Sequence, residues 1–83
     1  MRAVWYEEHG GAEVLQVGEM PIPEPDSGEV RVRVVVSGIN PSDWKMRARA
    51  MRFPKVVPNQ DGAGVIDAVG AGVSKSRIGE RVW

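Results

Sequence analysis

Alternating residues between positions 29 and 36 constrain the fold of this chain more than any other feature. The apolar positions are Val30, Val32, Val34 and Val36, and the polar positions between them are Glu29, Arg31 and Arg33. Successive side chains of a β-strand point to opposite faces, so this pattern predicts a strand with one apolar face. Val35 interrupts the polar face, and we expect both faces to be covered where the strand ends, just before Gly38.

Turn-forming residues divide the remainder of the chain into short segments. The 83 residues include 10 Gly and 6 Pro, which favour tight turns and interrupt helices. We therefore expect a mainly β fold with one short helix, in a single unit over residues 1–83. Further strands are expected at residues 2–6, 13–20 and 62–70 and from residue 80, and the first two form a hairpin.

The clearest signal for a helix start follows the alternating strand. Asn40 fits the N-cap, Pro41 fits the first helical position, and Asp43 lies in the first turn, where the helix dipole favours an acidic side chain. An apolar stripe of the helix is then predicted at Trp44, Ala48 and Met51. The basic residues between positions 45 and 55 fit a solvated helix face better than a phosphate site.

Polar residues after the strand ends are the candidate functional residues. Asn40 and Asp43 either act only as helix caps or also line a ligand site, and the sequence leaves both interpretations open. Asp61 either ties down its loop through backbone N–H groups or faces a pocket. His9 lies beside two glycines and fits an exposed loop residue better than a ligand.

Composition argues against several classes of function. Lys plus Arg and Asp plus Glu both number 11, so no net field favours nucleic acid as a partner. With no Cys and one His, the chain is a poor source of zinc ligands. Gly62-Ala63-Gly64 lacks the spacing of a dinucleotide-binding loop. No apolar run approaches the roughly 20 residues of a membrane helix, and no apolar signal region is present, so we expect a cytoplasmic protein without a membrane partner.

Several short motifs, taken in order, resemble those of a known family. They are Met1–Val4, Val14–Leu15, Pro21–Pro23, Gly28–Val34, Gly38–Asp43, Asp61–Ile66, Val69–Val73 and Gly79–Val82. Each motif is weak alone. Their order and spacing together resemble the medium-chain dehydrogenase/reductase superfamily, and within it the zinc-independent quinone oxidoreductase-like branch, over essentially the whole chain.

The resemblance also implies that catalytic zinc is absent. In the zinc alcohol dehydrogenases of this superfamily, a Cys ligand stands where this chain has Asn40, and a Gly-His-Glu segment matches residues 59–61. Here Gln60 replaces the His, and an amide is a poor substitute for thiolate or imidazole. The usual Gly is replaced by Asn59, which is among the non-glycine residues best able to adopt a left-handed backbone conformation.

The fold and activity that the resemblance implies are those of an oxidoreductase. A GroES-like β-barrel domain forms a cleft with a Rossmann domain, and hydride passes there from NADPH to a quinone or an α,β-unsaturated carbonyl. Residues that match Asn40 and Asp43 line this cleft, and those near Trp44 and Arg47 border it. We expect Asn40 and Asp43 to orient substrate and cofactor, and we assign no catalytic residue, because an amide exchanges no proton at neutral pH.

Length separates this chain from the family it resembles. Family members run to several hundred residues, so we expect these 83 residues to be the N-terminal part of the catalytic domain, without the Rossmann domain and inactive in isolation. The strand expected from residue 80 would then be only the first part of a longer strand. The alternative is a non-enzymatic small β domain that forms a homodimer or larger oligomer through its open strand edges.

Overall fold

The computed structural model describes residues 1–83, and the chain divides into two compact units. The first unit comprises Met1–Pro21 and Ile39–Gln60, and the second comprises Ile22–Gly38 and Asp61–Trp83. The first contains a two-stranded sheet and the second a three-stranded sheet. The elements are mainly strands with one α-helix, and the sheets are open, which confirms the expectation of a partial, mainly β fold.

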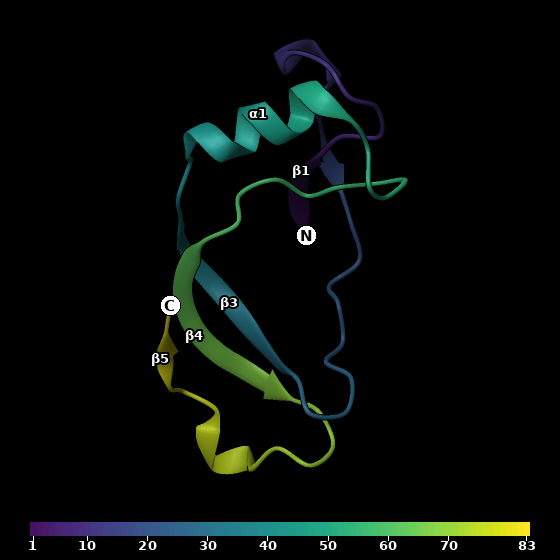
Figure 1. Ribbon diagram of the computed structural model, residues 1–83. Helices are drawn as coiled ribbons and strands as arrows, with labels where there is room; N and C mark the ends of the chain where they lie inside the picture. The colour runs from purple at the N-terminus through teal and green to yellow at the C-terminus, as the bar shows by residue number, and fades with distance from the viewer. The chain divides into compact units, whose positions relative to one another are not determined.

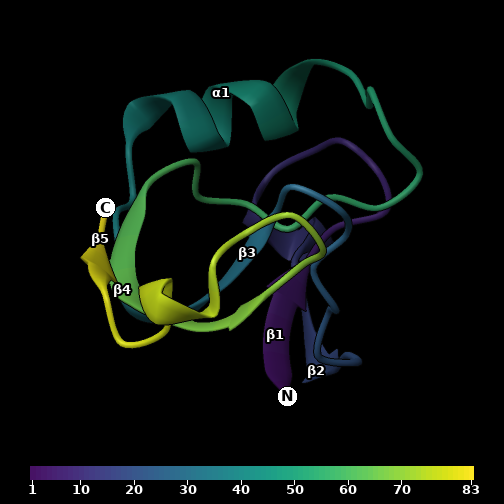
Figure 2. The same ribbon diagram turned by 90° about the horizontal axis from the view of Figure 1, so that it is seen from below.

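The hairpin predicted at the N-terminus is present in the first unit. Strand β1 (Arg2–Trp5) pairs antiparallel with β2 (Gln16–Glu19), and the two strands lie side by side in Figure 2. The connection contains a 3-10 helix, η1 (Ala12–Val14), which the sequence did not predict. The N–H of Leu15 donates to the carbonyl of Ala12 at 3.1 Å and closes this single turn.

The α-helix begins as predicted but ends earlier. Helix α1 (Pro41–Arg49) has Asn40 as its N-cap, and Ala50 already has an extended backbone, with φ −158° and ψ 150°. Met51 therefore lies outside the helix, and Trp44 is 54% exposed, so the predicted apolar stripe is wrong. The buried residue of the helix is Asp43, whose carboxylate is held by the cap.

The chain leaves α1 and returns to the first strand. Tyr6 and Val56 form an isolated antiparallel bridge, in which each N–H donates to the other residue's carbonyl at 2.9 Å. The Tyr6 side chain is 5% exposed, so it forms the interior of the first unit.

The second unit is built on the alternating strand. Strand β4 (Gly62–Val69) lies between β3 (Val30–Ser37) and β5 (Arg81–Val82), all antiparallel, as Figure 1 shows. A second 3-10 helix, η2 (Lys75–Arg77), precedes β5. Ile66 on β4 is 1% exposed and is the most buried side chain of this unit. The three strands expected here are confirmed.

The end of β3 differs from its prediction. Val34, Val35 and Val36 are 58%, 69% and 63% exposed, so the expectation that both faces are covered there is wrong for the described residues. β3 is an edge strand, and β5, with two residues, pairs with β4 only at Gly64 and Val65. Val34 pairs with Gly64 and Val36 with Ala63, and these small residues cover little of the valine side chains.

Candidate functional site

Two of the predicted site residues contact each other at the start of α1. The N–H of Asn40 donates to Oδ2 of Asp43 at 2.8 Å, and the N–H of Asp43 donates to the Asn40 carbonyl at 3.0 Å, within a capping box. Asp43 is 8% exposed. The capping interpretation of both residues is therefore confirmed, and a role toward a ligand stays a prediction.

The other two predicted residues point to different surroundings. The Trp44 ring is exposed, with Nζ of Lys45 5.8 Å from its centroid. Arg47 is half-buried, and its Nε donates to the Gly10 carbonyl at 3.4 Å while the Gly10 N–H donates to the Arg47 carbonyl at 2.8 Å. Arg47 thus ties the helix to the loop after β1. Neither Trp44 nor Arg47 lines either of the two cavities of the first unit described below.

A small cavity of about 40 Å³ lies beside Asp43. Its other walls come from Tyr6, Met46 and residues 56–60. Gln60, which resemblance places at a zinc-ligand position, lines the same cavity, and its Nε2 contacts Sδ of Met46 at 2.6 Å. The structure therefore brings Asp43 and Gln60 to one cavity, a pairing that sequence analysis did not make.

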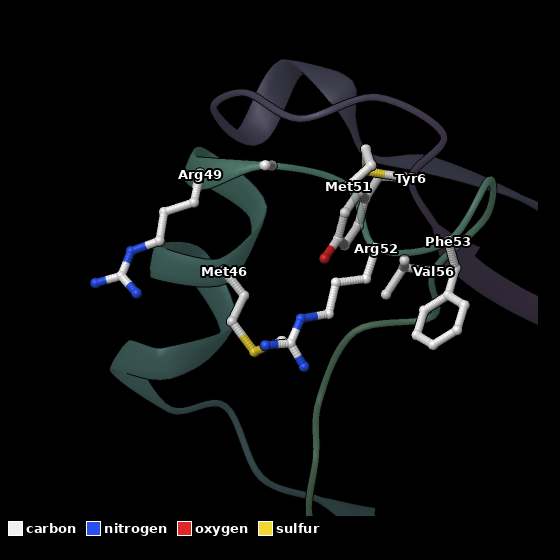
Figure 3. Close-up of a pocket in the computed structure, with 8 residues that line it drawn as sticks. Tyr6, Met46, Arg49, Met51, Arg52, Phe53 and Val56 are labelled. Atoms are coloured by element: carbon white, nitrogen blue, oxygen red, sulfur yellow. The ribbon is translucent and has the colours of Figure 1, made fainter.

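A larger cavity of about 330 Å³ lies at the other end of the helix (Figure 3). Its apolar wall is made by Tyr6, Met46, Met51, Phe53 and Val56, and Arg49 and Arg52 also line it. Sequence analysis missed this cavity. Tyr6 and Val56 are far apart in the chain, and no local pattern signals the backbone bridge that joins them.

Asp61 acts within the second unit as a loop anchor. Its carbonyl accepts hydrogen bonds from the N–H of Gly38 at 3.2 Å and from Oγ of Ser37 at 3.4 Å. A Cβ on Gly38 would collide with the Asp61 carboxylate, so the two segments approach closely. Of the two interpretations of Asp61, the structure supports the one in which it ties down its loop. The hydrogen bonds described here are accepted by the backbone carbonyl of Asp61. Asp61 lines neither cavity of the first unit.

Neither a metal cluster nor a dinucleotide loop is formed by these residues. No group of three His, Cys, Asp or Glu side chains is placed to hold a metal ion. Gly62 and Gly64 lie in β4 and pair with β3, so their backbone groups do not form a phosphate cradle ahead of a helix. The residues present therefore do not fit the pyrophosphate of a dinucleotide. No helix is both long and apolar enough to cross a membrane.

Comparison with known proteins identifies the family of the chain. Residues 26–83 match the family described as the alcohol dehydrogenase GroES-like domain. The chain is 39% identical over 88 residues to a quinone oxidoreductase from Lama guanicoe, across 100% of this chain and 26% of that protein. The chain thus spans about a quarter of the length of the curated relatives it matches.

Solved structures of the same superfamily have the same fold. A mycobacterial protein complexed with NADPH superposes with a TM-score of 0.87 at 30% identity, over 98% of this chain and 26% of that one. A cobalt- and zinc-bound alcohol dehydrogenase from Pyrobaculum aerophilum superposes with a TM-score of 0.86 at 35% identity, over 99% and 25%. The chain belongs to the alcohol dehydrogenase GroES-like domain family of the medium-chain dehydrogenase/reductase superfamily.

Proposed function

We propose that these 83 residues are the N-terminal part of the catalytic domain of an NADPH-dependent, zinc-independent quinone or enone oxidoreductase. The observation that carries the proposal is the match to a quinone oxidoreductase over the whole chain, together with the structural likeness to an NADPH complex. Asn40 and Gln60 support the zinc-independent branch, because amides bind zinc poorly. A cytoplasmic location stays a prediction.

In this proposal, the N-terminal end of α1 orients the reactants. A Rossmann domain would hold NADPH, which would supply the hydride for reduction of the quinone. The Asn40 amide can donate and accept hydrogen bonds but cannot exchange a proton, so it orients the acceptor. The carboxylate of Asp43 fixes the position of Asn40 by accepting a hydrogen bond from the Asn40 N–H. In this proposal, Trp44 and Arg47 border the cleft.

The cofactor requires residues beyond those of this chain. The glycines of β4 are paired in the sheet, so the dinucleotide phosphates need a loop from a Rossmann domain. We therefore propose that the 83 residues alone are inactive.

The test separates the capping role of Asn40 from its proposed role in the cleft. In the complete protein that carries this chain, NADPH oxidation is measured with a quinone acceptor for Asn40→Ser and Asn40→Ala. Serine also caps helices well, so Asn40→Ser retains the melting temperature, whereas Asn40→Ala lowers stability by about 1 kcal/mol. We expect both variants to lose about tenfold in kcat/KM, the scale of one lost hydrogen bond to the acceptor. Full activity of Asn40→Ser would show that Asn40 is only a cap.

A second candidate function is a non-enzymatic β domain that self-associates. The exposed valines at the end of edge strand β3 favour it, because an apolar strand edge is a template for pairing. Light scattering of the 83-residue chain tests it. A dimer that Val35→Lys converts to monomer would support this function, with Val17→Lys, 62% exposed on β2, as the control. A monomeric chain would exclude it.

A further inference from the structure

The larger cavity of the first unit contains a buried polar group that the fold itself does not use. Tyr6 is 5% exposed, and its hydrogen bonds are those of its backbone with Val56. Among the fully enclosed side-chain nitrogen and oxygen atoms, the one without a hydrogen-bond partner is Nε1 of Trp5. The Tyr6 hydroxyl is not in this class, so its oxygen is accessible from outside the packed interior. It reaches the cavity that its ring lines, and Figure 3 shows the oxygen pointing toward the space between Met46 and Arg52.

The remaining wall of the cavity is apolar. Met46, Met51, Phe53 and Val56 line it together with the Tyr6 ring. Thioether sulfur and aromatic rings make favourable contacts with a planar aromatic molecule. The volume of about 330 Å³ is at the lower end of the range for small-molecule sites, which is suited to a compact ring system.

Positive charge marks the mouth of this cavity. Arg49 and Arg52 line it, and neither forms an ion pair with a carboxylate of the chain. Figure 3 shows the Arg52 side chain extending toward the middle of the group of labelled side chains, whereas the Arg49 side chain extends away from it. A guanidinium without a partner next to an apolar pocket favours an anionic substituent, which it can bind in fork geometry.

We propose that this cavity binds a planar quinone or aromatic molecule that carries an anionic group. The ring lies against Met46, Phe53 and Tyr6, the Tyr6 hydroxyl donates to a ring oxygen, and Arg52 binds a sulfonate, carboxylate or phosphate. The cavity lies at the opposite end of α1 from Asn40, so this binding site is separate from the cleft of the proposed function.

The test compares two probes of similar shape and different charge. Binding of anthraquinone-2-sulfonate and of neutral 2-(hydroxymethyl)anthraquinone to the complete protein that carries this chain is measured by calorimetry without NADPH. We expect the anionic probe to bind about tenfold more tightly. Arg52→Gln should remove that preference and leave the neutral probe unchanged, and Arg2→Gln, an exposed charge on β1, should change neither affinity.

Tyr6→Phe tests the hydroxyl separately from the fold. The ring is retained and the hydroxyl has no partner in the chain, so the melting temperature should be unchanged while both probes bind about fivefold more weakly. Equal affinity of the two probes, or an unchanged preference in Arg52→Gln, would overturn the proposal. Unchanged binding of both probes by Tyr6→Phe would show that the Tyr6 hydroxyl does not bind them.

Kinetics distinguishes failure of this inference from failure of the proposed function. If neither quinone is reduced but binding depends on Arg52 and Tyr6, the oxidoreductase function is wrong and the binding site stands. If the complete protein reduces a quinone but binds the two probes with equal affinity, the function stands and the anion preference is wrong.

Discussion

Asn59 illustrates how one residue fixes the local path of the chain beside the candidate site. Its φ is 74°, the one positive value outside glycine, and it lines the small cavity with Asp43 and Gln60. The sequence predicted this conformation from the replacement of the family's Gly by Asn. A short polar side chain tolerates the left-handed region better than other side chains with a Cβ.

Replacing Asn59 should reveal the cost of a Cβ at this backbone angle. Asn59→Gly and Asn59→Ala both lose the contacts of the amide, so they differ from each other mainly in the Cβ. We expect the Ala variant to be about 1 kcal/mol less stable than the Gly variant, because φ 74° strains alanine. Urea denaturation of the two variants measures the difference. Equal midpoints and slopes would show that the backbone relaxes to negative φ.

At the scale of elements, the close pairing of β3 and β4 depends on small residues. A Cβ at Gly64 would collide with the Arg33 carbonyl, which belongs to the neighbouring backbone and cannot rotate away. The sequence predicted this strand. It could not predict that Val34–Val36 are exposed, because that depends on how many strands cover them rather than on the local pattern.

Gly64→Ala should therefore destabilise the second unit. Overpacking against a backbone atom costs about 1–3 kcal/mol, and we expect a loss in that range in chemical denaturation. Gly72→Ala is the comparison, since the space around Gly72 is open and only its φ of 85° opposes the change. A smaller loss at Gly64 than at Gly72 would contradict the role of close packing.

The turn between η2 and β5 contains an ion pair that titrates. Nη2 of Arg77 lies 2.9 Å from Oε1 of Glu80, and the hydrogen bond from Arg77 lowers the pKa of Glu80 below its ordinary value. A carboxyl whose pKa is lowered by folding stabilises the fold above its unfolded pKa, and this contribution is lost as pH falls through the folded pKa. Both side chains are about half exposed, so the effect on stability is small.

A carboxyl titration followed by NMR measures this shift directly. We expect the pKa of Glu80 to lie below its ordinary value and to rise toward that value in Arg77→Gln. An unchanged Glu80 pKa in that variant would show that Arg77 is not the cause. High salt should reduce the shift because the pair is exposed.

For the whole molecule, the local signals predicted the elements better than the cavities. The cap at Asn40 and the strands follow from short-range patterns, and the structure confirms them. The cavity walls join residues 6, 46 and 56, so they depend on tertiary contacts that no short motif encodes. Tyr6 and Arg52 were missed for this reason, and Asn40, Asp43, Trp44 and Arg47 stay predictions as cleft residues.

NADPH should not bind measurably to the 83-residue chain by itself. Gly62 and Gly64 are paired in the sheet, and no α-helix follows them. Calorimetric titration of the chain with NADPH checks this expectation. Micromolar binding would mean that these residues form a nucleotide site of their own, contrary to the proposed division between two domains.

The bridge between Tyr6 and Val56 also has a kinetic consequence. Its two hydrogen bonds can form only after the intervening chain has closed a long loop, which is a slow step relative to local hairpins and helices. The wall of the larger cavity is therefore completed late in folding. A molecule bound there would favour the closed loop over the open one, so its occupancy would be reported by slower amide exchange at Tyr6 and Val56.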